Sequence, residues 1–205
     1  MFKKTEGTHF IILLVYVDDV LLASNNLQLI QTTKVFLDNA FKIKDLGPAK
    51  YFLGLELARS SARINLSQHK YTIDLLQDIG FLLSKPVATP MASDLRLSSS
   101  GDFIADPSSF RCLIGKLLYL TTTRPDISFA VQQLSQFMTS PTTSHLQAAH
   151  RVLRYLKQSP GQGLFFRRNS PLKICAFSDS DWGTCPDSRK SITGYCIFLG
   201  SSLIS

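Results

Sequence analysis

The sequence predicts an α+β fold, in which antiparallel strand pairs and helices occupy separate stretches of the chain. Two apolar runs at residues 10–15 and 20–23 flank a short polar step, which is typical of a β-hairpin. Between residues 108 and 158, apolar side chains instead recur at helical spacing. Strand-like runs return at residues 172–177 and 194–199.

The hairpin, at residues 9–23, opens the chain, and a helix is predicted to follow it. Asn25-Asn26 offers an N-cap, and apolar side chains then recur at helical spacing up to Phe41. A glycine-proline pair at residues 47–48 ends this stretch.

A second strand pair is predicted at residues 51–57 and 62–66. We expect Ser67 to cap the next helix, which runs through Leu76 and ends at Gly80.

A linker and three further helices are predicted next. Residues 84–106 contain two prolines and a serine-glycine run, which is the composition of a linker. The first helix covers residues 108–122, the second starts at Pro125, and the third is capped by Thr142 or Ser144.

The composition excludes several classes of protein. Hydrophobic residues make up 44% of the 205-residue chain, enough for a core, and no apolar run approaches the ~20 residues of a membrane span. The N-terminus fits neither a secretory signal nor an organelle transit peptide. We therefore expect an intracellular protein of a reducing compartment, cytoplasm or nucleus, with no membrane partner. The cysteines lack the spacing of a zinc site and are expected to be buried free thiols: Cys112, Cys175, Cys185 and Cys196.

The net charge of +7 is concentrated in one segment. Between Pro107 and Ser170 the chain has eight basic residues and one acid, Asp126, so this segment carries a net charge of +7 while the rest is balanced. Such a localised charge favours binding to a phosphate backbone. The alternative is a solubilising surface.

Two adjacent carboxylates, Asp18 and Asp19, lie at the predicted tip of the first hairpin. Like charges held this close repel each other, which favours a divalent cation that bridges them. Tight turns prefer glycine, and this one has none, so the residues are expected to serve chemistry rather than the turn. The alternative is a plain hairpin whose polar tip faces water.

An ordered series of motifs accompanies the acidic pair. The motifs are LVYVDDVL at 14–21, KDLG at 44–47, YFLGLE at 51–56, LSQ at 66–68, KPVATP at 85–90, YLT at 119–121, TRPDI at 123–127, RVLRYLK at 151–157 and SDSDW at 178–182. Over nearly the whole chain, this series resembles the reverse transcriptases of copia-type retrotransposons.

The resemblance implies a partial reverse transcriptase fold, truncated at both ends. Residues 1–83 correspond to the C-terminal part of the polymerase palm with its primer grip, and residues 84–106 to a linker. Residues 107–160 correspond to a helical thumb and connection. Residues 163–205 correspond to the N-terminal part of a ribonuclease H-like domain with an incomplete sheet.

The resemblance also implies roles for single residues. Asp18 matches a metal-binding carboxylate of two-metal nucleotidyl transfer, and Asp19 matches a second, less directly engaged one. Tyr16 matches the residue beneath the primer terminus. The primer grip, which positions the primer end, includes Phe52, Leu53 and Gly54.

Asp179 matches the first metal ligand of ribonuclease H. Without the resemblance, Asp179 would be interpreted as an ordinary carboxylate at a strand end. The family's further ligands of that site would lie beyond Ser205, so only one is expected in this chain.

Helix 108–122 places Arg111, Gly115 and Tyr119 on its outward face, beside Lys116. A glycine inside a helix costs about 1 kcal/mol relative to alanine, which suggests the close approach of another backbone. The pattern leaves open whether a second helix or a nucleic acid approaches. The resemblance to the thumb helix implies the minor groove of a template–primer duplex.

The third predicted helix carries a basic stripe formed by Arg151, Arg154 and Lys157. A solvated face is the usual interpretation of such a stripe. The absence of interleaved acids favours an anionic partner.

The sequence therefore predicts a fragment of an RNA-directed DNA polymerase. The intact family uses Mg²⁺, deoxynucleoside triphosphates and an RNA–DNA or DNA template–primer. We expect the isolated chain not to polymerise DNA, because the family's other catalytic aspartate lies on an upstream strand that this chain lacks. The alternatives are a non-catalytic nucleic-acid-binding remnant and a chain without function.

Overall fold

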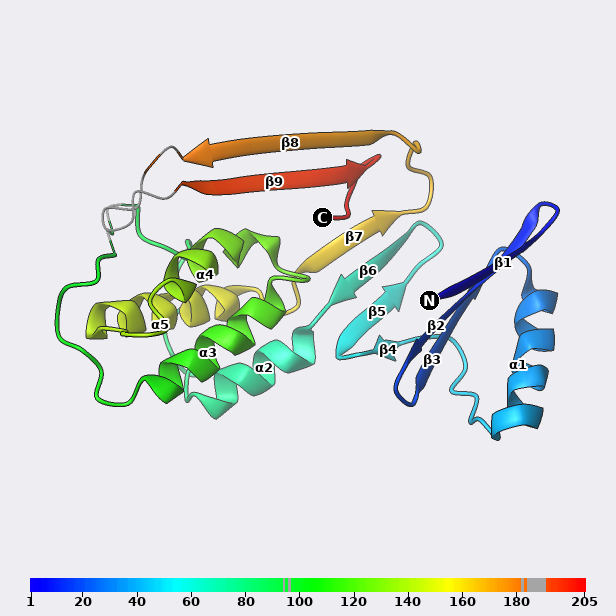
Figure 1. Ribbon diagram of the computed structural model, residues 1–205, viewed down its shortest axis with the longest axis horizontal. Coiled ribbons are helices and arrows are strands. Elements are labelled where there is room, and N and C mark those ends of the chain that lie inside the picture. The colour runs from blue at the N-terminus through cyan, green and yellow to red at the C-terminus, as the bar shows by residue number, and fades with distance from the viewer. Residues whose placement is uncertain (94, 96, 182, 184–190) are drawn as a thin grey trace. The chain divides into compact units, whose positions relative to one another are not determined.

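The computed structural model describes residues 1–205 apart from 94, 96, 182 and 184–190 (Figure 1). The chain combines antiparallel sheets with several helices, which confirms the predicted mixture of α and β structure. It divides into two compact units, Met1–Leu53 and Gly54–Ser205. This division falls inside the stretch that was predicted to form one palm domain up to residue 83.

The first unit is a three-stranded antiparallel sheet with one helix. Its strands lie in chain order, and the helix packs beside the third strand (Figure 1): β1 (Phe2–Glu6), β2 (His9–Tyr16), β3 (Asp19–Ser24) and α1 (Leu27–Phe41). The Asn26 side chain caps α1 by accepting a hydrogen bond from the Gln28 amide at 2.8 Å, as predicted. Strand β1 was not predicted, because its exposed residues show no apolar alternation.

Few side chains of the first unit are buried. Only Ile11 and Leu37 are buried among residues 1–53. Many large apolar side chains remain exposed, among them Phe2, Val17, Leu27, Phe36, Phe41 and Leu46. The unit therefore has only a small hydrophobic core of its own.

The predicted strand at residues 51–57 is interrupted. The structure contains β4 (Tyr51–Phe52) and β5 (Leu55–Arg59) in its place. Between them, Leu53 and Gly54 have φ angles of 51° and 76°. These left-handed conformations break the strand with a turn.

A sheet of the second unit joins segments that are far apart in the sequence. Strand β6 (Arg63–Ser67) pairs with β5 on one side and with β7 (Gly163–Arg167) on the other, both antiparallel (Figure 1). The sequence had grouped residues 163–167 with the ribonuclease H-like strands. Local patterns cannot reveal a pairing between strands so distant, which explains the difference.

The helices of the second unit follow the predicted order. They are α2 (His69–Asp78), α3 (Pro107–Leu120), the 3₁₀-helix η1 (Pro125–Ile127), α4 (Ser128–Ser135) and α5 (Thr143–Gln158). Thr142 caps α5, and its capping box with His145 confirms one of the two predicted caps. Ser67 was predicted to cap α2, which is wrong. Ser67 remains in β6, and Gln68 occupies the N-cap position.

The main core lies among these helices. Fully buried apolar side chains come from α2 to α5, including Leu76, Phe110, Ile114, Leu117, Val131, Leu134, Val152, Leu153 and Leu156. Arg124 is also buried, with 1% of its surface exposed. It pairs with Asp126 at 2.8 Å and donates to the Ser159 carbonyl oxygen at 3.0 Å, which ties η1 to the end of α5.

A second antiparallel sheet ends the chain, in the order β10-β9-β8. Strand β8 (Ile174–Asp181) and β9 (Ile192–Leu199) confirm the two predicted strands, and β10 (Ser202–Leu203) is added at the edge. Cys112, Cys175 and Cys196 are free thiols, as expected, and Cys185 lies outside the described residues. The prediction that they are buried is wrong, because Cys112 is exposed and Cys175 and Cys196 are only half-buried.

Candidate catalytic hairpin and nucleic-acid interface

The two acidic residues lie at the end of the β2–β3 hairpin. Tyr16 pairs with Asp19 at the last register position, so Val17 and Asp18 form the loop. Val17 has a φ of 49°, which is strained for a β-branched residue. Backbone strain of this kind clusters at functional sites. The glycine-free turn singled out by the sequence is therefore strained at its first loop position.

Both carboxylates are exposed, and neither has a hydrogen-bond or ion-pair partner among the residues that the structure describes. Mg²⁺ commonly binds one or two protein carboxylates together with substrate phosphates. Asp18 and Asp19 fit that part of a magnesium shell. Within the described part of the chain, no three His, Cys, Asp or Glu side chains gather as a fuller metal site would require.

Two residues predicted at the primer grip and at the thumb helix lie together. A Cβ atom placed on Gly54 would lie 2.5 Å from the Tyr119 hydroxyl oxygen. The ring of Tyr119 also contacts Tyr71 edge to face, with centroids 4.9 Å apart. The turn at Gly54 is therefore packed directly against the side chain of Tyr119.

Gly115 lies on the open face of α3. The residue is exposed, and a Cβ atom added to it would meet no described atom within 4 Å. A contact with a second helix, one of the two explanations of this glycine, is therefore absent from the described residues. The missing side chain leaves a shallow gap one turn before Tyr119.

The two basic residues of α3 already have partners. Arg111 donates to the carbonyl oxygens of Met138 and Thr139 at 2.8 and 3.3 Å. Lys116 pairs with Asp78 of α2 at 3.3 Å. Both side chains lie at the border of the exposed α3 face.

The basic stripe of α5 holds the linker. Arg151 donates to the carbonyl oxygen and the hydroxyl of Thr89 at 3.2 and 2.9 Å. Arg154 donates to the Lys85 carbonyl oxygen at 2.7 Å, and Lys157 donates to the Ser84 carbonyl oxygen. The three cations predicted to bind nucleic acid thus satisfy backbone acceptors of residues 84–89.

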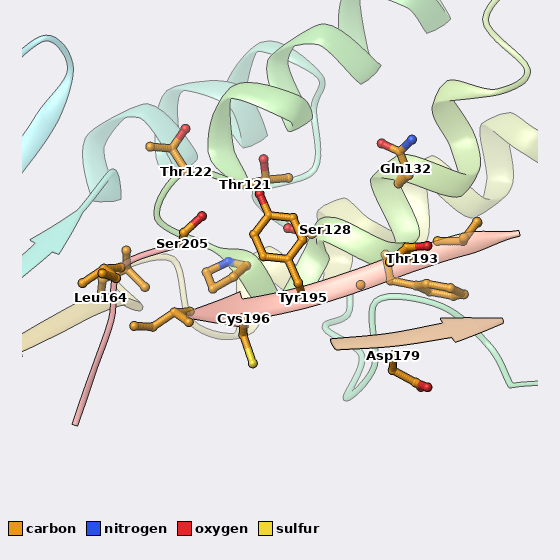
Figure 2. A pocket seen from close by; sticks show the side chains of 16 residues that line it. Thr121, Thr122, Ser128, Gln132, Leu164, Asp179, Thr193, Tyr195, Cys196 and Ser205 are labelled. Carbon is orange, nitrogen blue, oxygen red and sulfur yellow. The ribbon is translucent and has the colours of Figure 1, made fainter. Parts of the chain in front are cut away.

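Asp179 lies in β8 opposite Gly194 of β9. It borders a cavity of about 770 Å³ between the C-terminal sheet and the residues around η1 and α4 (Figure 2). The ring of Tyr195 points toward Thr121, whereas the carboxylate of Asp179 points away (Figure 2). The alternation of side chains along paired strands explains this difference.

Comparison with known proteins assigns the chain to a family. Residues 1–93 match the family model described as "Reverse transcriptase (RNA-dependent DNA polymerase)". The whole chain is 43% identical to the Retrovirus-related Pol polyprotein from transposon RE1 of Arabidopsis thaliana and covers 14% of it. Over 94% of its length it is 44% identical to an uncharacterized mitochondrial protein of Arabidopsis thaliana, of which it covers 80%. The chain belongs to the copia-type reverse transcriptase family.

The chain spans only a small part of the transposon polyproteins that it matches. It is also 37% identical to the Retrovirus-related Pol polyprotein from transposon TNT 1-94 of Nicotiana tabacum, over 16% of that protein. No solved structure matches the chain significantly. Among the described residues, no helix has the length and apolar composition needed to cross a bilayer.

Two features of the chain were missed in the sequence interpretation. The linker carbonyl groups that bind the α5 cations cannot be recognised from the side chains of residues 84–89. The one available signal is the pair of prolines in residues 84–90, which makes regular backbone pairing unfavourable and leaves carbonyl groups unpaired there. The pairing of β6 with β7 also places Arg63 opposite Arg167. The sequence separates these arginines by about half of the chain.

Proposed function

We propose that this chain forms the catalytic hairpin and part of the template–primer grip of an RNA-directed DNA polymerase. The observation that carries the proposal is the pair of exposed carboxylates, Asp18 and Asp19, at a strained hairpin tip inside the family match. Exposed acids without partners are free to bind cations. The proposed activity is that of larger polyproteins, in which the stretch that matches this chain is one part.

Asp18 and Asp19 would hold Mg²⁺ together with ligands from outside the described residues. The metal, when bound, would activate the primer hydroxyl and neutralise charge on the triphosphate of an incoming deoxynucleotide. Tyr16 is exposed beside the acids, where an aromatic ring can support the primer terminus. Because only two carboxylates gather here among the described residues, we expect the isolated chain not to extend a primer.

The exposed face of α3 would contact the template–primer duplex. Gly115 leaves room for a sugar-phosphate backbone, and Tyr119, one turn later, offers a half-exposed ring. Gly54 and its neighbours Phe52 and Leu53 would position the primer end. The α5 cations remain candidates for phosphate contacts through donors that the linker does not use, since a guanidinium group has five.

Asp179 would contribute one ligand to a ribonuclease H-like metal site. Its carboxylate lies at an exposed strand position, pointing away from the cavity that its strand borders. The other ligands of such a site would come from further along the polyprotein.

A non-catalytic nucleic-acid-binding module is the second candidate function. It is favoured by the gathering of only two carboxylates in the described part of the chain and by the net charge of +7 between residues 107 and 170. The two candidates share duplex binding and differ in whether Asp18 matters for DNA synthesis.

Substitution of Gly115 tests the proposed duplex contact. Gly115→Leu places a side chain in open space, so the fold should be kept and stabilised by about 0.5–1 kcal/mol. If a duplex lies against α3, the same substitution should weaken binding of an RNA–DNA hybrid at least tenfold in fluorescence anisotropy. Ser109→Leu, at an exposed position nearer the start of α3, is the matched control and should bind like the unsubstituted chain. Unchanged hybrid binding by Gly115→Leu would remove α3 from the interface.

A further inference from the structure

Two arginines face each other across the β6–β7 strand pair. Arg63, the first residue of β6, lies directly opposite Arg167, the last residue of β7. Both side chains are exposed, and neither has an ion-pair partner in the part of the chain that the structure describes. Like charges directly opposite in a sheet are destabilising, so an anion between them would relieve their repulsion.

An exposed aromatic ring lies on the same face. Phe165 is two residues before Arg167, so the two side chains point to the same side of β7. The ring is 47% exposed, and the Arg63 guanidinium carbon lies 5.2 Å from its centroid. Asn65 is paired opposite Phe165, and its buried side-chain oxygen has no hydrogen-bond partner among the described residues. The strand pair thus presents two cations and an aromatic ring together on one face.

No acid of the three paired strands neutralises this face. The only acidic residue of β5, β6 and β7 is Glu56. It is paired opposite Ser67, at the far end of β6 from Arg63, and its carboxylate accepts a hydrogen bond from the Lys70 amide at 2.6 Å. The charge of the face therefore stays positive.

We propose that this face, formed by Arg63, Phe165 and Arg167, binds single-stranded nucleic acid. The two guanidinium groups bind phosphate oxygens, and an unpaired base stacks on the ring of Phe165 beside the planar Arg63 group. A single strand is favoured over a duplex because a duplex keeps its bases stacked on each other, whereas unpaired bases can stack on protein aromatic rings.

The proposal goes beyond the proposed function. It uses β6 and β7, whereas the template–primer contact uses the β2–β3 hairpin and α3. Either proposal can fail while the other stands, because the substitutions that test them lie on different elements.

Binding of a labelled 12-nucleotide single strand to the full chain, measured by fluorescence anisotropy, tests the site. Arg63→Gln combined with Arg167→Gln should weaken binding at least tenfold. The slope of the logarithm of the binding constant against the logarithm of salt concentration should become less steep by about 1.4, or ~0.7 for each lost phosphate contact. The matched control is Arg59→Gln combined with Lys173→Gln. It removes the same charge, and Arg59, paired with Ile64, lies on the other face of the sheet. The control should change affinity less than twofold.

A second comparison separates stacking from simple charge attraction. Phe165→Leu should weaken binding of the normal strand about tenfold, because base–aromatic stacking contributes strongly to such complexes. The same variant should bind an abasic strand of equal length as well as the unsubstituted chain does. This comparison is made within one variant, so its outcome does not depend on how the double arginine variant folds.

Three results would overturn the proposal. One is a double arginine variant that binds like its charge-matched control. Another is equal weakening of normal and abasic strands by Phe165→Leu. The third is equally tight binding of poly-glutamate, which would identify a general site for acidic polymers. Loss of hybrid binding by Gly115→Leu with single-strand binding intact would show that the two surfaces act separately.

Discussion

At the scale of single residues, Gly54 is constrained in two independent ways. Its φ of 76° lies in the left-handed region, and a Cβ atom would lie 2.5 Å from the Tyr119 hydroxyl oxygen. Gly80 has the same φ of 76°, but nothing lies within 4 Å of its Cβ position. The two glycines therefore separate the cost of backbone strain from the cost of the steric contact.

Alanine substitution at these glycines should give two different losses of stability. Gly80→Ala is expected to cost about 1–2 kcal/mol from backbone strain alone. Gly54→Ala is expected to cost about 1–3 kcal/mol more, because the new methyl group overlaps the tyrosine hydroxyl. Urea unfolding of each variant measures both values.

Tyr119→Phe provides the control, because it removes the hydroxyl and keeps the ring. In the Tyr119→Phe background, the loss of unfolding free energy caused by Gly54→Ala should fall to the loss caused by Gly80→Ala. Equal costs at both glycines with Tyr119 present would contradict the contact.

His145 links stability to pH. The ring is fully buried, stacks on Phe137 with centroids 4.0 Å apart, and its Nδ1 accepts a hydrogen bond from the Thr142 amide at 2.9 Å. Burial lowers the pKa of His145 below its ordinary value of 6.5. Protonation at Nδ1 would also remove the acceptor of the capping box.

The free energy of unfolding should therefore fall as the solution is acidified. Since the unfolded chain has the higher histidine pKa, it binds protons first, and stability is lost as pH falls through about 6.5 toward the folded value. His145→Gln keeps an acceptor at the third helical position and cannot titrate, so it should reduce this loss. Unfolding in urea at pH 7.5 and 5.5 measures the difference.

His150, whose pKa is also lowered by burial, remains in the variant and acts in the same sense. The pH dependence should shrink rather than vanish. An unchanged pH dependence in His145→Gln would contradict the role assigned to His145.

At the scale of elements, α5 and the linker form one structural unit. Arg151, Arg154 and Lys157 donate to backbone acceptors of residues 84–89, and the Val87 amide donates to the Arg154 carbonyl oxygen at 3.4 Å. Hydrogen bonds to charged donors are stronger than neutral ones. A segment that its composition marks as a flexible linker is thus fixed to a helix.

Removal of these three cations should release the linker. In the triple alanine variant, cleavage within residues 84–90 by thermolysin is expected to speed up at least tenfold, because each lost bond contributed about 1.5–3 kcal/mol to holding the segment. Limited proteolysis followed by mass spectrometry locates the cuts.

Lys3, Lys44 and Lys50, which are exposed residues of the first unit, give a control with the same loss of charge when changed to alanine. Cleavage of the linker at the unsubstituted rate in the α5 variant would show that its cations do not hold the segment.

The predicted elements that the structure confirmed were those with strong local signals. The β2–β3 hairpin, the Asn26 cap and the helices α3 to α5 follow from apolar spacing and capping residues in the sequence. Elements that depend on distant pairing were missed: β7 joins β6 only in the folded chain, and the same pairing keeps Ser67 in a strand instead of at a cap. The partners of the α5 cations were missed because backbone acceptors have no sequence signature.

At the scale of the whole molecule, the two units differ in how much they bury. Residues 1–53 hold two buried side chains, whereas the second unit has a continuous helical core. The sparsely buried unit contains the candidate catalytic hairpin, and it lies within the family match over residues 1–93. The proposed activity in a longer polyprotein would leave these exposed apolar side chains to be covered by other segments.

DNA synthesis by a chimeric polyprotein tests the central claim most directly. The 205-residue chain would replace the matching stretch of the transposon RE1 polyprotein, to which it is 43% identical over 206 residues. Primer extension on an RNA template with Mg²⁺ would then be measured for the chimera, for Asp18→Asn, and for Asp38→Asn as a control at an exposed acid of α1. We predict that the chimera and the Asp38→Asn control extend the primer and that Asp18→Asn lowers the rate at least 100-fold. Extension by Asp18→Asn at the rate of the chimera, or an inactive chimera beside an active parent polyprotein, would contradict the claim.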